Sequence, residues 1–97
     1  MEKYFLTLSN NVVVLGTLVS EDENSLKIKS PYMVVNNGTE MLLLPYLQDI
    51  LNQNIDELVF LKSNVINVVK ADTNTSLVRK YVETTTGIKT GEELILG

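Results

Sequence analysis

The chain has 97 residues, of which 44% are hydrophobic and 21% charged, a composition typical of one globular domain with a single core. It contains no cysteine and no histidine, which excludes disulfide frameworks, thiolate zinc sites and catalysis by either side chain. Twelve acidic and eight basic residues give a net charge of −4, the wrong sign for a nucleic-acid binder that relies on overall attraction.

Neither a signal peptide nor a membrane span is expected. The first three residues carry no positive excess, and the apolar side chains that follow them alternate with polar ones. The longest apolar run, residues 41–47, is far shorter than the roughly 20 residues that span a bilayer. We therefore expect a cytoplasmic protein with no membrane partner.

The first two expected elements are strands joined by a tight turn. Residues 3–8 contain strand-forming side chains, and residues 9–11 (Ser-Asn-Asn) end the run with types that tolerate left-handed turns. Residues 12–20 are β-branched and nearly all apolar, which is typical of a strand covered on both faces. Gly16 lies in the middle of this run, where it predicts a bend, a bulge or a close backbone approach.

A third strand and a hairpin follow the polar turn at residues 21–25. Residues 26–29 (Leu-Lys-Ile-Lys) alternate strictly, so one face points inward and the lysines outward. The strand can continue past Pro31, which removes one ladder donor and predicts an edge position or a kink. Residues 36–38 (Asn-Asn-Gly) are a hairpin-turn signature, and residues 41–44 supply the returning strand.

The second half of the chain adds shorter elements. Residues 45–52 have apolar side chains at helical spacing and predict a short helical turn or a packed loop. Residues 57–61 form another strand, residues 62–64 a tight turn, and residues 65–69 a short last strand.

A helix then begins at Ser76, with Thr75 as its cap. Its apolar stripe consists of Leu77, Val78, Tyr81 and Val82. The hydroxyl groups expected at the surface are those of Tyr32, Tyr46 and Tyr81. Residues 92–96 end the chain with a segment that packs or remains mobile.

These elements predict a mainly β fold. Five or so strongly bent antiparallel strands form a sheet or small open barrel over residues 1–71, and residues 72–97 form a C-terminal extension with a short helix. Such a body has two open edges and apolar runs longer than one face can bury. Strand-to-strand association of several copies is therefore expected.

Two groups of turn residues carry a resemblance to a known family. Residues 8–11 (Leu-Ser-Asn-Asn), residues 16–18 (Gly-Thr-Leu) and Asp22 follow one another as in the first Sm motif. Residues 61–65 (Leu-Lys-Ser-Asn-Val) are similar to the second Sm motif, and Lys62 fits the Hfq branch best. With its long insertion between these motifs, the chain resembles the Sm, LSm and Hfq superfamily of small ring-forming RNA-binding proteins.

The sequence also departs from the pattern of this superfamily. Too few residues precede the first strand for the short helix that family members carry there. Ser25 and Leu26 stand where the first motif normally has a stacking side chain followed by Asn, and Asn24 is the nearest amide. Ser63 stands where the second motif usually has Gly. Asn-rich turns and degenerate motifs are compatible with a viral or mobile-element member.

The resemblance implies a homo-oligomeric ring of about five to seven subunits. In such a ring the strand at residues 57–61 pairs with the strand at residues 65–69 of the next copy, and single-stranded RNA lies at the pore. The leading hypothesis is therefore a non-catalytic RNA chaperone or scaffold. The alternative is the same ring as a structural or protein-interaction module without an RNA site, which the acidic charge and the altered stacking motif favour.

The candidate RNA-binding residues are Asp22, Asn24, Lys62, Ser63 and Asn64. In this role the Asn amides would meet a base edge and Lys62 a phosphate or carbonyl oxygen. Their other role is turn chemistry, in which Asp, Asn and Ser bond the local backbone and Lys is solvated. Both roles remain open at this point.

An enzyme is the least supported class. The acidic run at residues 21–23 has no matched acid or base elsewhere, and it lacks the Asp-x-Asp spacing and the Gly of a calcium loop. No Gly-rich phosphate loop occurs. The sequence therefore predicts no catalytic residue, no metal site and no cofactor.

Overall fold

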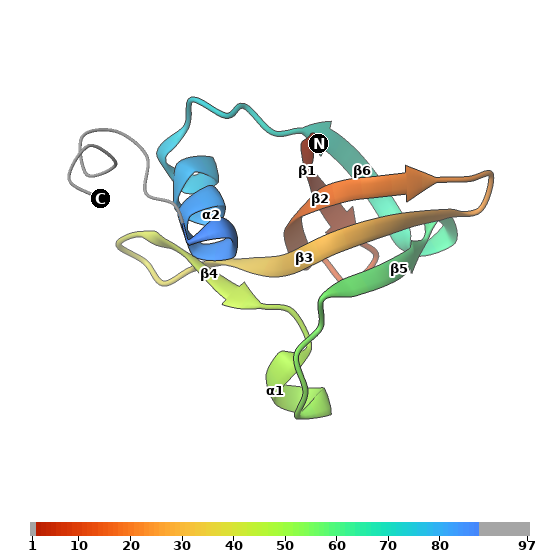
Figure 1. Ribbon diagram of the computed structural model, residues 1–97, viewed down its shortest axis with the longest axis horizontal. Coiled ribbons are helices and arrows are strands. Elements are labelled where there is room, and N and C mark those ends of the chain that lie inside the picture. The colour runs from red at the N-terminus through yellow and green to blue at the C-terminus, as the bar shows by residue number, and fades with distance from the viewer. Residues whose placement is uncertain (1, 88–97) are drawn as a thin grey trace.

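One sheet of six antiparallel strands forms the body of the protein, and a helix covers part of it (Figure 1). The computed structural model describes residues 2–87. The strands are β1 (Lys3–Leu8), β2 (Val13–Glu21), β3 (Ser25–Asn36), β4 (Met41–Pro45), β5 (Glu57–Leu61) and β6 (Val65–Lys70). The helices are α1 (Gln48–Leu51), a 3-10 turn η1 (Lys62–Asn64) between β5 and β6, and α2 (Ser76–Thr86). The mainly β prediction is confirmed.

The long strand β3 serves two partners on one edge. Residues 25–29 pair with β5, and residues 32–36 pair with β4, while the opposite edge pairs with β2. The change of partner occurs at Ser30, whose φ of 51° is left-handed, and at Pro31. The left-handed residue Ser30 directly precedes Pro31, for which the sequence predicted an edge position or a kink. Each of the six strand segments expected from the sequence forms a strand, so the expected total of five or so strands becomes six. β4 and β5 pair one after the other along the same edge of β3.

The sheet does not close. Its order is β4-β3-β2-β1-β6, with β5 beside the first half of β3. Within residues 2–87, β5 pairs only with β3 and β6 only with β1, although η1 joins the two strands directly. Both strands therefore keep one open edge.

Gly16 on β2 leaves room for the side chain of Ile28 on the paired strand β3. A Cβ atom built on Gly16 would lie 2.1 Å from Cγ2 of Ile28, where no real Cβ atom is tolerated. The β2–β3 register shifts between Leu15 and Thr17, on either side of this glycine. This register shift agrees with the bulge predicted for Gly16, and the close neighbour of Gly16 is the side chain of Ile28, not a strand backbone.

Two apolar clusters lie on the two faces of the bent sheet. The first contains Leu6, Leu8, Val14, Leu26, Ile28 and Phe60. The second contains Leu15, Ala71, Val78 and Tyr81. Because Val78 and Tyr81 belong to α2, this helix shares a core with β2, and its predicted apolar stripe is confirmed.

The Tyr81 hydroxyl group is buried, which corrects the prediction that it lies at the surface. It lies 2.9 Å from the carbonyl oxygen of Ser30 and 3.1 Å from that of Lys29, and it exchanges a further hydrogen bond with the Thr17 hydroxyl group at 3.1 Å. Burial raises the pKa of Tyr81 above its usual range. The kink at Ser30 presents these carbonyl groups to the helix, so Tyr81 ties α2 to the bend of β3.

α2 lacks a side-chain cap at its N-terminal end but ends at a left-handed glycine. Thr75 occupies the cap position as predicted, but its hydroxyl group donates to the carbonyl oxygen of Asp72 at 2.9 Å and bonds no amide of the helix. Gly87 ends the helix in the left-handed conformation. Residues 92–96 lie outside the described residues. No helix between residues 2 and 87 is long and apolar enough to cross a membrane.

Candidate functional site

The turn between β2 and β3 is organised around Asp22. Its Oδ1 atom accepts hydrogen bonds from the backbone N–H groups of Asn24 and Ser25, both at 2.8 Å, and from the Ser25 hydroxyl group at 3.0 Å. These bonds, that of the Asn24 N–H above all, hold the pKa of Asp22 below its usual value. Asp22 therefore performs the turn chemistry that was the alternative to a binding role.

The same turn contacts η1. The backbone N–H of Lys62 donates to the carbonyl oxygen of Asn24 at 2.8 Å, and the Lys62 ammonium group donates to Oε2 of Glu21 at 2.7 Å. The fold thus brings Asp22, Asn24 and Lys62 together. Because both charged side chains are partly exposed, the ion pair is worth less than about 1 kcal/mol and can be exchanged for another partner.

The remaining two candidate residues belong to η1 but not to one common pocket. Ser63 is exposed. Asn64 accepts a hydrogen bond from the backbone N–H of Ser9 at 2.9 Å and lines a cavity beside the β1–β2 turn. Lys62 lines a different cavity. The five predicted residues therefore divide between two sides of η1.

Two cavities flank η1. The first, of about 310 Å³, lies beside β6, and its lining consists of Tyr4, Leu6, Leu18, Glu21, Leu26, Ile28, Lys62, Val65 and Val68. The second, of about 470 Å³, follows β5, and its lining consists of Leu8, Ser9, Asn10, Tyr46, Leu47, Leu58, Val59, Phe60, Leu61 and Asn64. Residues 2–87 contain no group of three acidic, His or Cys side chains that could hold a metal ion.

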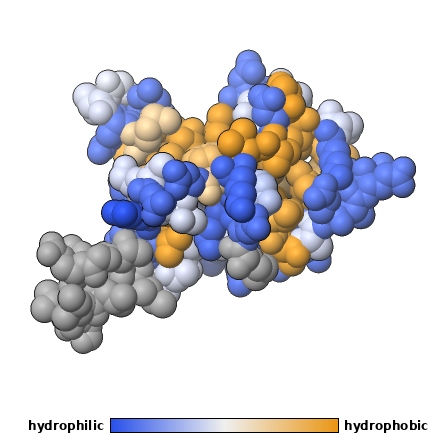
Figure 2. Space-filling view, turned by 90° about the horizontal axis from the view of Figure 1, so that it is seen from above, coloured by the Kyte–Doolittle hydropathy of each residue, from blue (hydrophilic) through white to orange (hydrophobic). Residues whose placement is uncertain are grey.

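The open edges of β5 and β6 carry exposed apolar side chains. On β5, Val59 and Leu61 are each 53% exposed. On β6, Ile66, Val68 and Val69 are at least half exposed. Figure 2 shows that hydrophobic residues, interrupted by hydrophilic ones, gather on the right half of this face of the molecule. Sequence reasoning predicted the open edges but not which side chains stay exposed.

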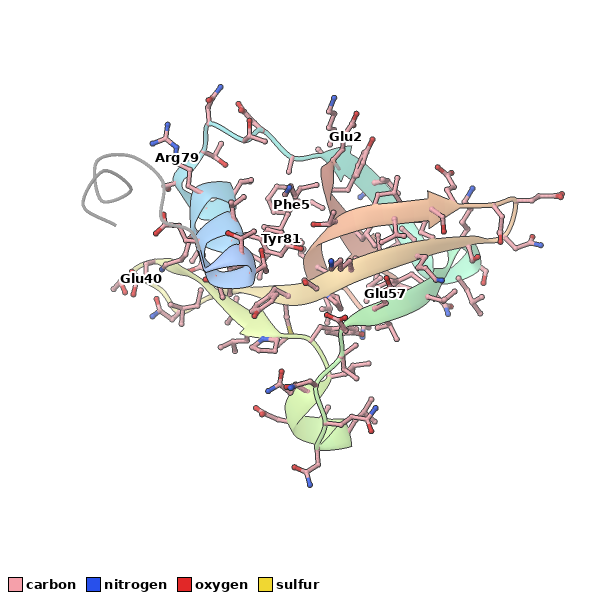
Figure 3. All side chains as sticks on the ribbon, in the orientation of Figure 1. Glu2, Phe5, Glu40, Glu57, Arg79 and Tyr81 are labelled. Carbon is pink, nitrogen blue, oxygen red and sulfur yellow. The ribbon has the colours of Figure 1, made fainter. Side chains whose placement is uncertain are left out.

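Two further ion pairs mark the ends of these strands. At the start of β5, Lys27 lies 3.8 Å from Glu57. At the end of β6, Lys70 lies 3.2 Å from Glu2, which also accepts a hydrogen bond from the Tyr4 hydroxyl group at 3.0 Å. Figure 3 shows Glu57 on β5 and Glu2 beside the start of β1.

Comparisons with known proteins leave the geometry as the basis for a functional proposal. No protein-family model matches the sequence, and no curated protein is similar to it. The likeness to the Sm, LSm and Hfq superfamily therefore rests on the turn motifs quoted above and stays a prediction.

Proposed function

We propose that this chain is a non-catalytic assembly module with an Sm-like fold, which forms a homo-oligomeric ring by pairing β5 of one copy with β6 of the next. One observation carries this proposal. β5 and β6, the strands that η1 connects, each have an open edge, and together they carry five exposed large apolar side chains. Open edges of this composition are a surface that monomeric proteins avoid. Pairing of β5 with β6 of the next copy would cover both open edges.

The contact joins two different edges, so it is heterologous. A heterologous contact propagates from copy to copy, and it closes into a ring when the rotation between neighbours divides a full turn. The assembly needs no histidine, cysteine or metal, which agrees with the composition. Each added subunit also adds a charge of −4, which disfavours a broad RNA-binding surface.

Single-stranded RNA binding is the second candidate function. It is favoured by the hydrogen bond from the backbone N–H of Lys62 to the carbonyl oxygen of Asn24, which holds two of the candidate residues together. A ring repeats this cluster in every subunit, so weak individual contacts would add up to useful avidity. The Glu21 carboxylate opposes this role, because it neutralises the ammonium group that would meet a phosphate.

A lysine placed on either edge tests the assembly. We expect Val69→Lys on β6 and Leu61→Lys on β5 each to convert the oligomer to a monomer, because a charge at a paired edge must lose its water. Size-exclusion chromatography with light scattering measures the mass. Both changes move the net charge toward zero, so general repulsion between subunits cannot explain a loss of assembly.

Leu44→Lys on the open edge of β4 is the matched control, since Leu44 is 44% exposed and lies outside the proposed contact. It should leave the mass unchanged. Wild-type protein that is strictly monomeric across the concentration range would contradict the ring.

Fluorescence anisotropy with labelled oligo(U) and oligo(A) separates the two candidate functions. We expect no binding by wild-type protein at micromolar concentration, at low or moderate salt, because the Glu21 carboxylate cancels the charge of Lys62 and the net charge of −4 repels RNA. Glu21→Gln frees this lysine and should produce salt-sensitive binding at low salt only. Lys80→Ala on α2 is the control and should change nothing. Wild-type binding that is lost in Lys62→Ala would establish the RNA function instead.

A further inference from the structure

We propose that the cavity of about 310 Å³ beside β6 binds a small zwitterionic amphiphile, such as a free α-amino acid with an apolar side chain. The apolar side chain of the ligand enters the cavity, its carboxylate meets Lys62, and its ammonium group meets Glu21. Every residue of the lining belongs to one chain. The inference therefore goes beyond the assembly proposed above and does not rest on it.

The cavity has an apolar floor and a charged rim. Leu6, Leu26 and Ile28 line it and are at most 4% exposed, so they form the floor. Glu21 and Lys62 also line it, but their side chains are 51% and 36% exposed, so they form the rim. A ligand with an apolar part and a polar head matches this arrangement when the head stays at the rim.

The volume of the cavity limits the size of the ligand. Cavities that take drug-sized molecules enclose about 300–1,000 Å³, so this cavity lies at the lower end of the range. It has room for an apolar chain of a few carbon atoms and not for a long lipid tail. Val68 of β6 lines the cavity and is 50% exposed, which places the entrance beside β6.

The charges at the rim select the head group of the ligand. Lys62 and Glu21 form an ion pair at 2.7 Å, so their charges cancel. A ligand with a single charge is attracted by one member of this pair and repelled by the other. A zwitterion presents a carboxylate to Lys62 and an ammonium group to Glu21, so that neighbouring charges all have opposite signs.

The ion pair can bind such a head group without separating. The Lys62 ammonium group has three N–H donors, and Oε2 of Glu21 accepts one of them. The next acidic residue, Asp22, does not line the cavity, and its Oδ1 atom is bonded within the β2–β3 turn. Within residues 2–87, the lining therefore offers the ligand one cation and one anion.

The second cavity beside η1 lacks this combination. Its polar lining residues are Ser9, Asn10, Tyr46 and Asn64, and none of the described residues that line it is charged. It has no group that would hold a carboxylate or an ammonium ion by charge. The second cavity is therefore an internal reference for binding to the first.

Three probes that share one apolar chain test the head group at neutral pH. L-norleucine carries both charges, hexanoate lacks the ammonium group, and pentylamine lacks the carboxylate. We expect norleucine to bind in the millimolar range and roughly fivefold more tightly than either of the others. NMR titration of methyl-labelled protein measures the affinity and locates the ligand. The methyl resonances of Leu26 and Ile28 should shift, and those of Leu58 and Val59 in the second cavity should not.

Two substitutions at the rim should change the preference in opposite directions. Glu21→Gln leaves Lys62 as the charged residue of the lining, so hexanoate should bind at least as tightly as norleucine. Lys62→Met leaves Glu21 in this position, so pentylamine should become the preferred probe. Lys27→Met and Glu57→Gln are the matched controls, because this exposed ion pair lies outside the cavity. Neither control should change the order of the probes.

Thermal unfolding should show that all variants are folded. Wild-type protein that binds hexanoate as tightly as norleucine would overturn the inference, as would an order of probes that both rim variants leave unchanged. Norleucine that shifts no methyl resonance of the cavity up to its solubility limit would overturn it too. Binding that appears only in Val69→Lys, the variant expected to be monomeric, would show that a neighbouring copy fills the cavity instead.

Discussion

Gly16→Ala is expected to lower the free energy of unfolding by about 2–3 kcal/mol, because overpacking a tight core costs this much. The added methyl group would lie 2.1 Å from Cγ2 of Ile28 and 3.5 Å from the carbonyl oxygen of Lys29. Ile28 is completely buried, so any shift of its side chain disturbs the packing of the core around it. Urea denaturation at fixed protein concentration measures the loss, since assembly itself contributes to stability.

A double-mutant cycle shows whether this contact is the cause. Ile28→Leu removes the branch methyl group that the new Cβ atom would meet, so Gly16→Ala should cost less in the Ile28→Leu background. We expect a coupling free energy of about 1 kcal/mol or more. Gly38→Ala is the comparison for an added methyl group in open space. Gly38 has a positive φ of 98° and no atom near its Cβ position, so only the backbone cost of about 1 kcal/mol applies. Additive costs for residues 16 and 28 would contradict the steric explanation.

The strands could be predicted from the sequence because their signals are local. Alternation over residues 26–29 and the β-branched run at residues 12–20 indicate strands wherever the partners lie. The division of β3 between β4 and β5 could not be predicted in this way. It depends on which distant segment reaches each half of the strand, and the left-handed backbone at Ser30, not its side chain, makes the change possible.

The candidate site was predictable to a similar degree. The turn motifs predicted that Asp22, Asn24 and Lys62 belong to one site, and the fold brings these three residues together. The partner of Lys62 was missed, although Glu21 stands directly before Asp22. In the sequence, the only indication that Glu21 pairs with Lys62 is their opposite charge. Glu21 comes to lie next to η1 only because the whole sheet places the end of β2 there. The contacts of Tyr81 could not be predicted for the same reason. Its place in the apolar stripe of the helix predicted burial of the ring, but the acceptors for its hydroxyl group lie on the distant strand β3.

Tyr81 is the second residue with a large expected effect. Tyr81→Phe should lower the free energy of unfolding by about 1–2 kcal/mol, because it removes the donor of two part-buried hydrogen bonds to the carbonyl groups of Lys29 and Ser30. Tyr81→Ala should cost about 3–5 kcal/mol, because it also leaves a cavity in a completely buried position. Tyr46→Phe is the matched control, with a half-buried ring that stacks on Phe60, and should cost less than about 0.5 kcal/mol.

The dependence on pH distinguishes the hydroxyl group from the ring. Burial raises the pKa of Tyr81 in the folded state above the unfolded value of about 10. Above that pH the unfolded chain releases the proton while the folded chain still holds it, so this contribution to stability is complete below pH 10 and is lost as the pH rises. Wild-type protein should therefore lose stability more steeply than Tyr81→Phe in alkaline urea denaturation. Equal slopes for the two proteins would show that the hydroxyl group is not buried as the structure has it, and that the packing of the ring alone holds α2 against the bend of β3.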